Sequence, residues 1–227
     1  MTRVVYLHGF ASSPLSGKAQ FFRRKFEALG IAMEIPQLDQ GRFEELTISS
    51  QLAVIERAVG EQPAILIGSS LGGYLAALYA SRHPSRVSKL ALLAPAFQFP
   101  RRWRERYSAE DWERWQREGS APVFHYGEGR ERRLGFKFVE DAAQYEDEPA
   151  FTQPALILHG TRDNIVPAWI SSSYAARHTN VKLMLLESGH ELTDVLDPMW
   201  TEISSYIKVP ESIDSGSKSK SIELSID

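Results

Sequence analysis

Short runs of apolar residues alternate along the chain with longer segments in which apolar residues recur every three or four positions. The short runs are bounded by Gly, Pro or polar residues, and they comprise Arg3–Leu7, Ala32–Ile35, Ala64–Ile67, Lys89–Leu93, Ala155–Leu158 and Lys182–Leu186. Continuous hydrophobicity over so few residues is typical of strands that are buried on both faces, as in a parallel sheet. The pattern therefore predicts a sheet of about six parallel strands.

The longer segments predict helices between these strands, namely Lys18–Leu29, Phe43–Val59, Leu71–Arg82, Ala168–Arg177 and Pro198–Ile207. We expect Gly30 to cap the first helix at its C-terminus. We expect Asp197 to cap the last helix at its N-terminus, because a proline follows it and proline favours the first helical position. Strands that alternate with helices predict right-handed crossovers and a doubly wound, mostly parallel α/β sheet.

The segment 97–150 interrupts this alternation and shows no convincing strand pattern. It holds 11 of the 24 aromatic residues of the chain. A long aromatic insertion at the carboxyl end of a strand is typical of a lid or substrate wall, although its aromatic side chains can also form a small core of its own. Three tryptophans of this segment, Trp103, Trp112 and Trp115, are our tentative substrate-binding residues.

We therefore expect three parts in the chain. A core comprises residues 1–96 and 151–209, and a helical, aromatic-rich cap comprises residues 97–150. Residues 210–227 form a polar tail rich in Ser and Lys, to which we assign no function.

Composition and charge narrow the classes of function. Of 227 residues, 43% are hydrophobic and 24% are charged, as in ordinary globular proteins. The 26 Lys and Arg against 29 Asp and Glu give a net charge of −3, which argues against nucleic acid as a main partner. The absence of cysteine excludes disulfides, thiolate zinc sites and a cysteine nucleophile. With no signal-peptide pattern and no apolar window of about 18 residues, we expect a cytoplasmic protein without a membrane span, a metal or an organic cofactor, and the oligomeric state stays open.

The strongest chemical signal is the sequence Gly-Ser-Ser-Leu-Gly at Gly68–Gly72. It directly follows one expected strand and directly precedes an expected helix, which is the setting of a nucleophile elbow. Glycine is needed on both sides of the central serine because a side chain there would collide with the neighbouring strand or helix. The motif predicts Ser70 as a nucleophile, and the alternative is a Gly-rich turn with a capping serine.

A serine nucleophile needs a base that an acid holds in position. His190 follows the last expected strand and so falls at the same edge of the sheet as Ser70, whereas His125 in the insertion is a weaker alternative. Asp163 follows another expected strand and can hold the imidazole in the correct tautomer. Asp194 and Glu191 are nearer to His190 in sequence but less well placed.

The oxyanion of a tetrahedral intermediate needs preorganised hydrogen-bond donors. We expect these to be the backbone N–H of Leu71, next to the nucleophile, and that of Phe10, in the loop after the first strand. Gly9 permits the bend that this loop requires. His8 is predicted to bond to nearby backbone and to shape the loop.

Taken together, four segments resemble the α/β-hydrolase superfamily, namely Tyr6–Phe10, Gly68–Gly73, His159–Pro167 and Ser188–His190. The segment Leu7–Pro14, with Ser16 and Lys18 after it, is similar to the small bacterial YqiA/YcfP-like serine esterases. The resemblance covers about residues 3–96 and 154–207.

This resemblance implies an α/β-hydrolase core that lacks the first two strands of the superfamily. It also implies a serine hydrolase that cleaves a small-molecule carboxylic ester or thioester through an acyl-enzyme. The aromatic insertion favours an apolar acyl group. A C–C-bond hydrolase or a peptidase on the same fold stays open, as does a non-catalytic binding module.

Overall fold

The computed structural model describes residues 3–208. Its main sheet is parallel throughout, with the strand order β2-β1-β3-β4-β7-β8. The six strands lie on the six predicted runs and comprise β1 (Val4–Leu7), β2 (Met33–Glu34), β3 (Ala64–Ser69), β4 (Val87–Leu93), β7 (Ala155–Gly160) and β8 (Val181–Leu186). The predicted parallel α/β sheet is thus confirmed. The predicted tail, residues 210–227, lies outside the described residues.

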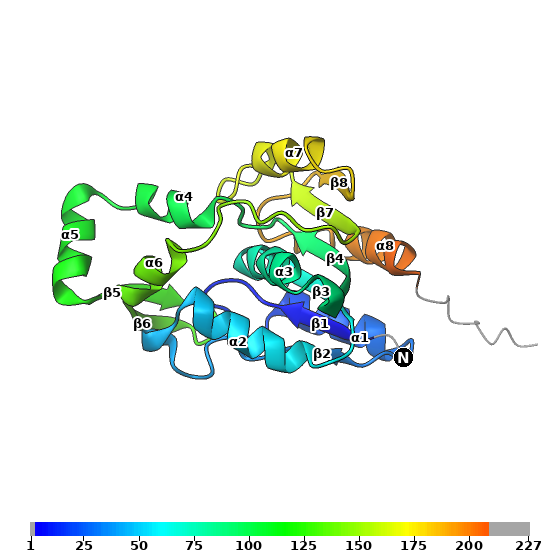
Figure 1. The fold of residues 1–227 in the computed structure, drawn as a ribbon, viewed down its shortest axis with the longest axis horizontal. Coiled ribbons are helices and arrows are strands. Elements are labelled where there is room, and N and C mark those ends of the chain that lie inside the picture. Colours follow the sequence, from blue (N-terminus) through cyan, green and yellow to red (C-terminus); the bar gives the residue numbers. More distant parts are fainter. Residues whose placement is uncertain (1–2, 209–227) are drawn as a thin grey trace, which may run out of the picture.

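Helices cover both faces of this sheet (Figure 1). On one face, α1 (Gly17–Glu27) and α8 (Leu196–Ile207) form a core that includes Phe22 and Ile203. On the other face, α2 (Ile48–Val59), α3 (Leu71–Arg82) and α7 (Ala168–Ala176) form a second core. A short 3-10 turn, η2 (Pro84–Arg86), leads from α3 into β4. This arrangement confirms the doubly wound architecture.

The helix predicted over 43–59 is divided in two, so that prediction was wrong in its first turn. A 3-10 turn, η1 (Phe43–Glu45), is followed by α2, which begins only at Ile48. The cause is a capping box, in which the Ser50 N–H donates to Thr47 Oγ1 and the Thr47 N–H donates to Ser50 Oγ. Such reciprocal bonds define the start of a helix.

Two predicted caps are also wrong. Helix α8 begins at Leu196, one residue before Asp197, so Asp197 lies in the first turn and pairs with Lys25 at 2.9 Å. Helix α1 ends at Glu27, with Ala28 as its C-cap. Gly30 lies beyond this cap in the left-handed region, and its N–H donates to the Glu27 carbonyl.

The insertion contains a β-hairpin, which contradicts the expectation that it has no strand. Its elements are α4 (Phe99–Glu105), α5 (Ala109–Glu118), β5 (Ser120–His125), β6 (Arg130–Gly135) and α6 (Lys137–Ala142). Among residues 3–208, the two strands pair only with each other, and β6 starts with four consecutive charged residues. The hairpin escaped prediction because neither strand contains the continuous apolar run of a strand buried on both faces.

The insertion lies beside the carboxyl ends of the parallel strands (Figure 1). Several polar contacts attach it to the core, and three of them lie at the hairpin and at α6. The Gly127 N–H donates to the carbonyl of Ala11, the Ser49 Oγ–H donates to Asp141, and Arg132 pairs with Glu44.

Candidate active site

The topology places two loops side by side at the carboxyl edge of the sheet. Strand β1 lies between β2 and β3, so the chain turns to opposite sides of β1 in its first two crossovers. In open α/β sheets, ligands bind at the carboxyl edge where the strand order changes direction in this way. The loops after β1 and β3 carry Phe10 and Ser70.

Ser70 occupies a strained turn between β3 and α3. Its backbone has φ +53° and ψ −117°, a conformation that L-residues rarely adopt. A Cβ added to Gly68 would lie 2.3 Å from the Gly72 carbonyl oxygen, and one added to Gly72 would lie 2.1 Å from that of Leu7. The predicted need for these two glycines is therefore confirmed.

The structure brings the three predicted catalytic side chains into hydrogen-bond contact. His190 Nδ1 lies 2.7 Å from Asp163 Oδ2, and His190 Nε2 lies 3.0 Å from Ser70 Oγ. Since an ionised carboxylate only accepts hydrogen bonds, Nδ1 carries the ring proton and donates it to Asp163. Nε2 is then free to accept from the Ser70 hydroxyl, and this geometry allows His190 to take the serine proton.

Asp163 is held by four donors. Its Oδ1 accepts from the backbone N–H groups of Ile165 and Val166, at 2.9 and 2.8 Å. Its Oδ2 accepts from His159 Nε2 at 3.1 Å as well as from His190. Burial alone would raise the pKa of Asp163, but the hydrogen bonds from His159 and His190 outweigh it and hold the pKa below its ordinary value. The carboxylate stays ionised and can stabilise an imidazolium at His190.

His159 is a supporting residue that the sequence analysis did not single out. Its side chain is fully buried, and its Nε2 also contacts the Val166 carbonyl oxygen at 2.8 Å. Its Nδ1 lies 2.7 Å from Ser171 Oγ, which donates to it. The sequence offered one indication of the hydrogen bond to Asp163, namely that His159 and Asp163 are four residues apart. Such a spacing alone does not predict a hydrogen bond within a loop.

The predicted oxyanion donors belong to the loop after β1 and to the residue that follows Ser70. A Cβ added to Gly9 would lie 3.6 Å from Ser70 Cβ, so the loop after β1 passes directly beside the serine. Within residues 3–208, the N–H groups of Phe10 and Leu71 donate to no protein acceptor outside regular helix and strand bonding. Both are therefore available to an oxygen atom of a ligand.

His8 fixes the peptide group that contains the Phe10 N–H. Its Nδ1 donates to the Gly9 carbonyl at 3.0 Å, and its Nε2 lies 3.4 Å from the Leu38 N–H. Burial lowers the pKa of His8, which keeps the ring neutral and able to accept at Nε2. The predicted role of His8 in shaping the loop is confirmed.

Of the three tentative substrate-binding tryptophans, Trp103 approaches the oxyanion loop. Its ring meets that of Phe10 edge-on, with centroids 4.8 Å apart. Trp115 is 1% exposed and donates its indole N–H to the Leu134 carbonyl, and Trp112 packs against it. Both lie on α5, at the outer end of the insertion (Figure 1). They form part of the core of the insertion rather than a wall near Ser70.

His125, the weaker alternative base, lies behind the oxyanion loop. Its Nε2 is 3.5 Å from Asp39 Oδ2, and both residues line a cavity of about 10 Å³ together with His8 and Phe10. Glu128 lies close enough to complete a set of three possible metal ligands. However, the Glu128 carboxylate already pairs with two arginines, whose positive charges disfavour a cation there.

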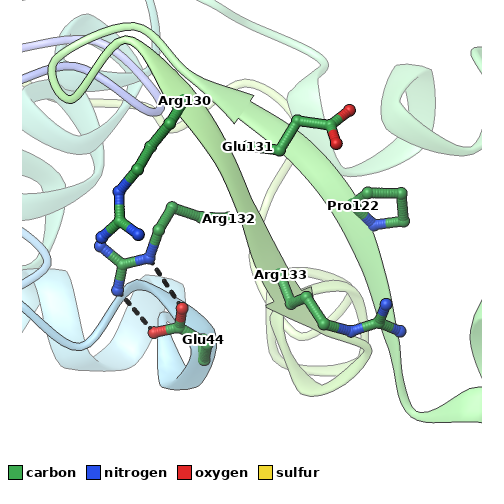
Figure 2. Close-up of a pocket in the computed structure, with 6 residues that line it drawn as sticks. All are labelled: Glu44, Pro122, Arg130, Glu131, Arg132 and Arg133. Carbon is green, nitrogen blue, oxygen red and sulfur yellow. Dashed lines mark hydrogen bonds and ion pairs between the residues drawn. The ribbon is translucent and has the colours of Figure 1, made fainter.

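A larger hollow, of about 440 Å³, lies on the hairpin and has no lining residue in common with the Ser70 site (Figure 2). Two of its lining residues, Arg132 and Glu44, are joined by two hydrogen bonds, at 2.7 and 2.8 Å. The hydrogen bonds from Arg132 hold the pKa of Glu44 at about 2. Because this guanidinium is already paired, the contact serves to attach the hairpin to η1.

Comparison with known proteins identifies the family. The model of the uncharacterised protein family UPF0227 matches residues 3–206, nearly the whole described chain. The chain belongs to this family. It is the family of YqiA/YcfP-like esterases, within the α/β-hydrolase fold, as the sequence motifs predicted.

Solved structures of other proteins have the same overall fold as this chain. Alpha/beta hydrolase domain-containing protein 10 from mouse is 24% identical, with a TM-score of 0.75 over 91% of this chain and 89% of that one. Est1E from Butyrivibrio proteoclasticus, solved with ferulic acid bound, is 20% identical, with a TM-score of 0.77 over 92% of this chain and 88% of that one.

A curated relative matches over a short stretch. Forty-five residues are 51% identical to 1-acylglycerol-3-phosphate O-acyltransferase ABHD5 from Sus scrofa, which is 20% of this chain and 13% of that protein. The fold is that of hydrolases and esterases.

Among the described residues, no helix has the length and apolar character that crossing a bilayer requires.

Proposed function

We propose that this protein is a serine hydrolase that cleaves carboxylic esters or thioesters of apolar acyl groups. The observation that carries the proposal is the continuous set of hydrogen bonds from Ser70 Oγ through His190 to Asp163. Esterases among the proteins of the same fold support the reaction class.

In the proposed mechanism, His190 Nε2 takes the proton of Ser70 as Oγ attacks the acyl carbonyl carbon. The N–H groups of Phe10 and Leu71 stabilise the resulting oxyanion. His190 then gives its proton to the leaving oxygen or sulfur, and the acyl-enzyme remains. A water molecule that loses a proton to His190 attacks the acyl carbon, and Ser70 Oγ leaves and regains a proton from the imidazolium.

The apolar preference rests on the aromatic surroundings of the loop that carries Phe10. Its ring packs against Phe43, Trp103 and Phe138, and the last two belong to the insertion. We propose that the insertion, residues 97–150, acts as a cap whose Trp103 side contacts the acyl group. The bound ferulic acid of Est1E is an acid with an aromatic ring, which is compatible with a site of this kind.

The test is a comparison of Ser70→Ala with Ser69→Ala on p-nitrophenyl esters of increasing chain length and on acyl thioesters. We expect Ser70→Ala to lower kcat by about 10⁴- to 10⁶-fold while the circular dichroism spectrum stays unchanged. Ser69→Ala, which removes the neighbouring hydroxyl, should keep kcat within about tenfold.

Full turnover by Ser70→Ala would contradict the proposal. If the wild type cleaved only amides or C–C bonds, the proposed substrate class would be wrong. The assignment of Ser70 as the nucleophile would stand, because the same three groups can serve those reactions.

A further inference from the structure

Lys18 is a buried charged residue that the proposed mechanism does not use. It lies in the first turn of α1, just after the loop that carries Phe10, and the residue is only 8% exposed. Lysine is almost never buried to this extent without a partner. Its Nζ donates to the backbone carbonyl of Glu191 at 2.7 Å, and Glu191 is the residue next to His190.

The loop that receives this hydrogen bond is strained. Leu192, which follows Glu191, is buried and has φ +55°, a left-handed conformation that is unfavourable for a residue with a large side chain. The carbonyl bound by Lys18 belongs to the Glu191–Leu192 peptide group. On the other side of His190, the Ser188 hydroxyl donates to Asp194. The backbone N–H of Arg162 also donates to the Ser188 carbonyl at 2.9 Å, so distant segments of the chain hold the histidine loop on both sides of His190, and Lys18 provides the contact on the C-terminal side.

The charges around Lys18 link it to the catalytic groups. The carboxylates of Glu191, on the same loop as His190, and of Asp163, on the loop after β7, both favour the protonated lysine. Burial outweighs them and lowers the pKa of Lys18 to about 8. The ammonium group is thus present at neutral pH and is lost in mildly basic solution.

We propose that Lys18 is a positioning residue for His190, whose buried ammonium group fixes the histidine loop through the Glu191 carbonyl and so couples it to the helix after the oxyanion loop. This inference rests on the proposed function. Lys18 acts through the backbone and does not contact the reacting atoms. Hydrogen bonds from a charged donor are roughly twice as strong as those from a neutral one, so deprotonation of Lys18 loosens the loop.

The first test compares Lys18→Met, Lys18→Arg and Lys25→Met. Lys18→Met keeps most of the aliphatic stem but removes the donor, and we expect kcat to fall roughly tenfold to a hundredfold with little change in KM, because a small misplacement of His190 has this effect. Lys18→Arg keeps a charged donor and should recover part of the loss. Lys25 lies on the same helix and forms an exposed pair with Asp197, so Lys25→Met should leave kcat unchanged.

The second test is the pH dependence of kcat, which a purely structural role would not change. In the wild type, kcat should decrease as pH rises through about 8, as Lys18 loses its proton. This decrease should be absent in Lys18→Met and displaced to higher pH in Lys18→Arg. The wild-type profile can be measured even if Lys18→Met does not fold.

Two results would overturn the inference. One is a Lys18→Met variant with the kcat and the pH profile of the wild type. The other is a wild-type kcat that stays constant between about pH 7 and 10. A wild-type protein without any ester or thioester turnover would instead contradict the proposed function, so the two failures can be told apart.

Discussion

At the scale of single residues, the neighbours of Asp163 determine its ionisation state and, through it, the tautomer of His190. Two backbone N–H groups and two histidines donate to its two oxygens, and their combined effect keeps it ionised although it is buried. An ionised Asp163 dictates that the proton of His190 resides on Nδ1. The orientation of His190 toward Ser70 therefore depends on the charge of Asp163.

Asp163→Asn should lower kcat about 10⁴-fold without unfolding the protein, since an amide can present a donor to Nδ1 and favour the wrong tautomer. Steady-state kinetics on the best ester of the panel measures this. Asp194→Asn is the matched control, because Asp194 lies on the histidine loop but accepts from Ser188 rather than from His190. Equal losses in the two variants would contradict the assignment of Asp163.

The sequence was sufficient to predict that Ser70, Asp163 and His190 lie together, because each follows a strand whose carboxyl end must lie at the same edge of a parallel sheet. It did not indicate the roles of His159 and Lys18. Their hydrogen bonds depend on the path of a loop and on the depth of a side chain, and neither feature has a periodicity that could be read from the sequence.

At the scale of elements, buried strands were easier to predict from the sequence than exposed ones. The central strands β1, β3, β4 and β7 were predicted because burial on both faces makes their sequences continuously apolar, and the edge strands β2 and β8, although partly exposed, have similar apolar runs. The hairpin β5–β6 was missed because its strands are partly exposed and β6 starts with Arg130–Arg133. The break in the helix predicted over 43–59 was missed because it depends on local hydrogen bonds between Thr47 and Ser50, which start α2 at Ile48.

Two tryptophans of the insertion should behave differently when truncated. Trp103→Ala removes the edge-on contact with Phe10, so we expect KM to rise most for esters with long acyl chains. Trp115→Ala empties the buried centre of the insertion and should lower the free energy of unfolding by about 3–5 kcal/mol. Chain-length kinetics and urea denaturation of both variants measure these effects. A Trp103→Ala variant with unchanged KM for every ester would contradict the proposed contact of the cap with the acyl group.

At the scale of the whole molecule, stability should decrease in acid partly through Asp163. Its pKa is lower in the folded state, so the stabilisation is complete above the ordinary value of about 3.9 and is lost as pH falls through the folded value. Glu44 acts in the same direction, but it is half-exposed and water weakens its pair with Arg132. In urea denaturation at about pH 5, 4 and 3, Asp163→Asn should show a smaller decrease of the unfolding free energy than the wild type. A decrease of the same size in both would mean that folding does not lower the pKa of Asp163.

The most direct test of the central claim is covalent labelling with a fluorophosphonate probe, followed by mass spectrometry of the labelled peptides. An activated serine attacks phosphorus, displaces fluoride and stays attached, so the label reports the nucleophile without any assumption about the substrate. We predict a single label on Ser70 in the wild type and in Ser69→Ala, slower labelling of Asp163→Asn, and none of Ser70→Ala. A label on another residue, or an unlabelled wild type, would contradict the assignment of Ser70 as a nucleophile activated by His190 and Asp163.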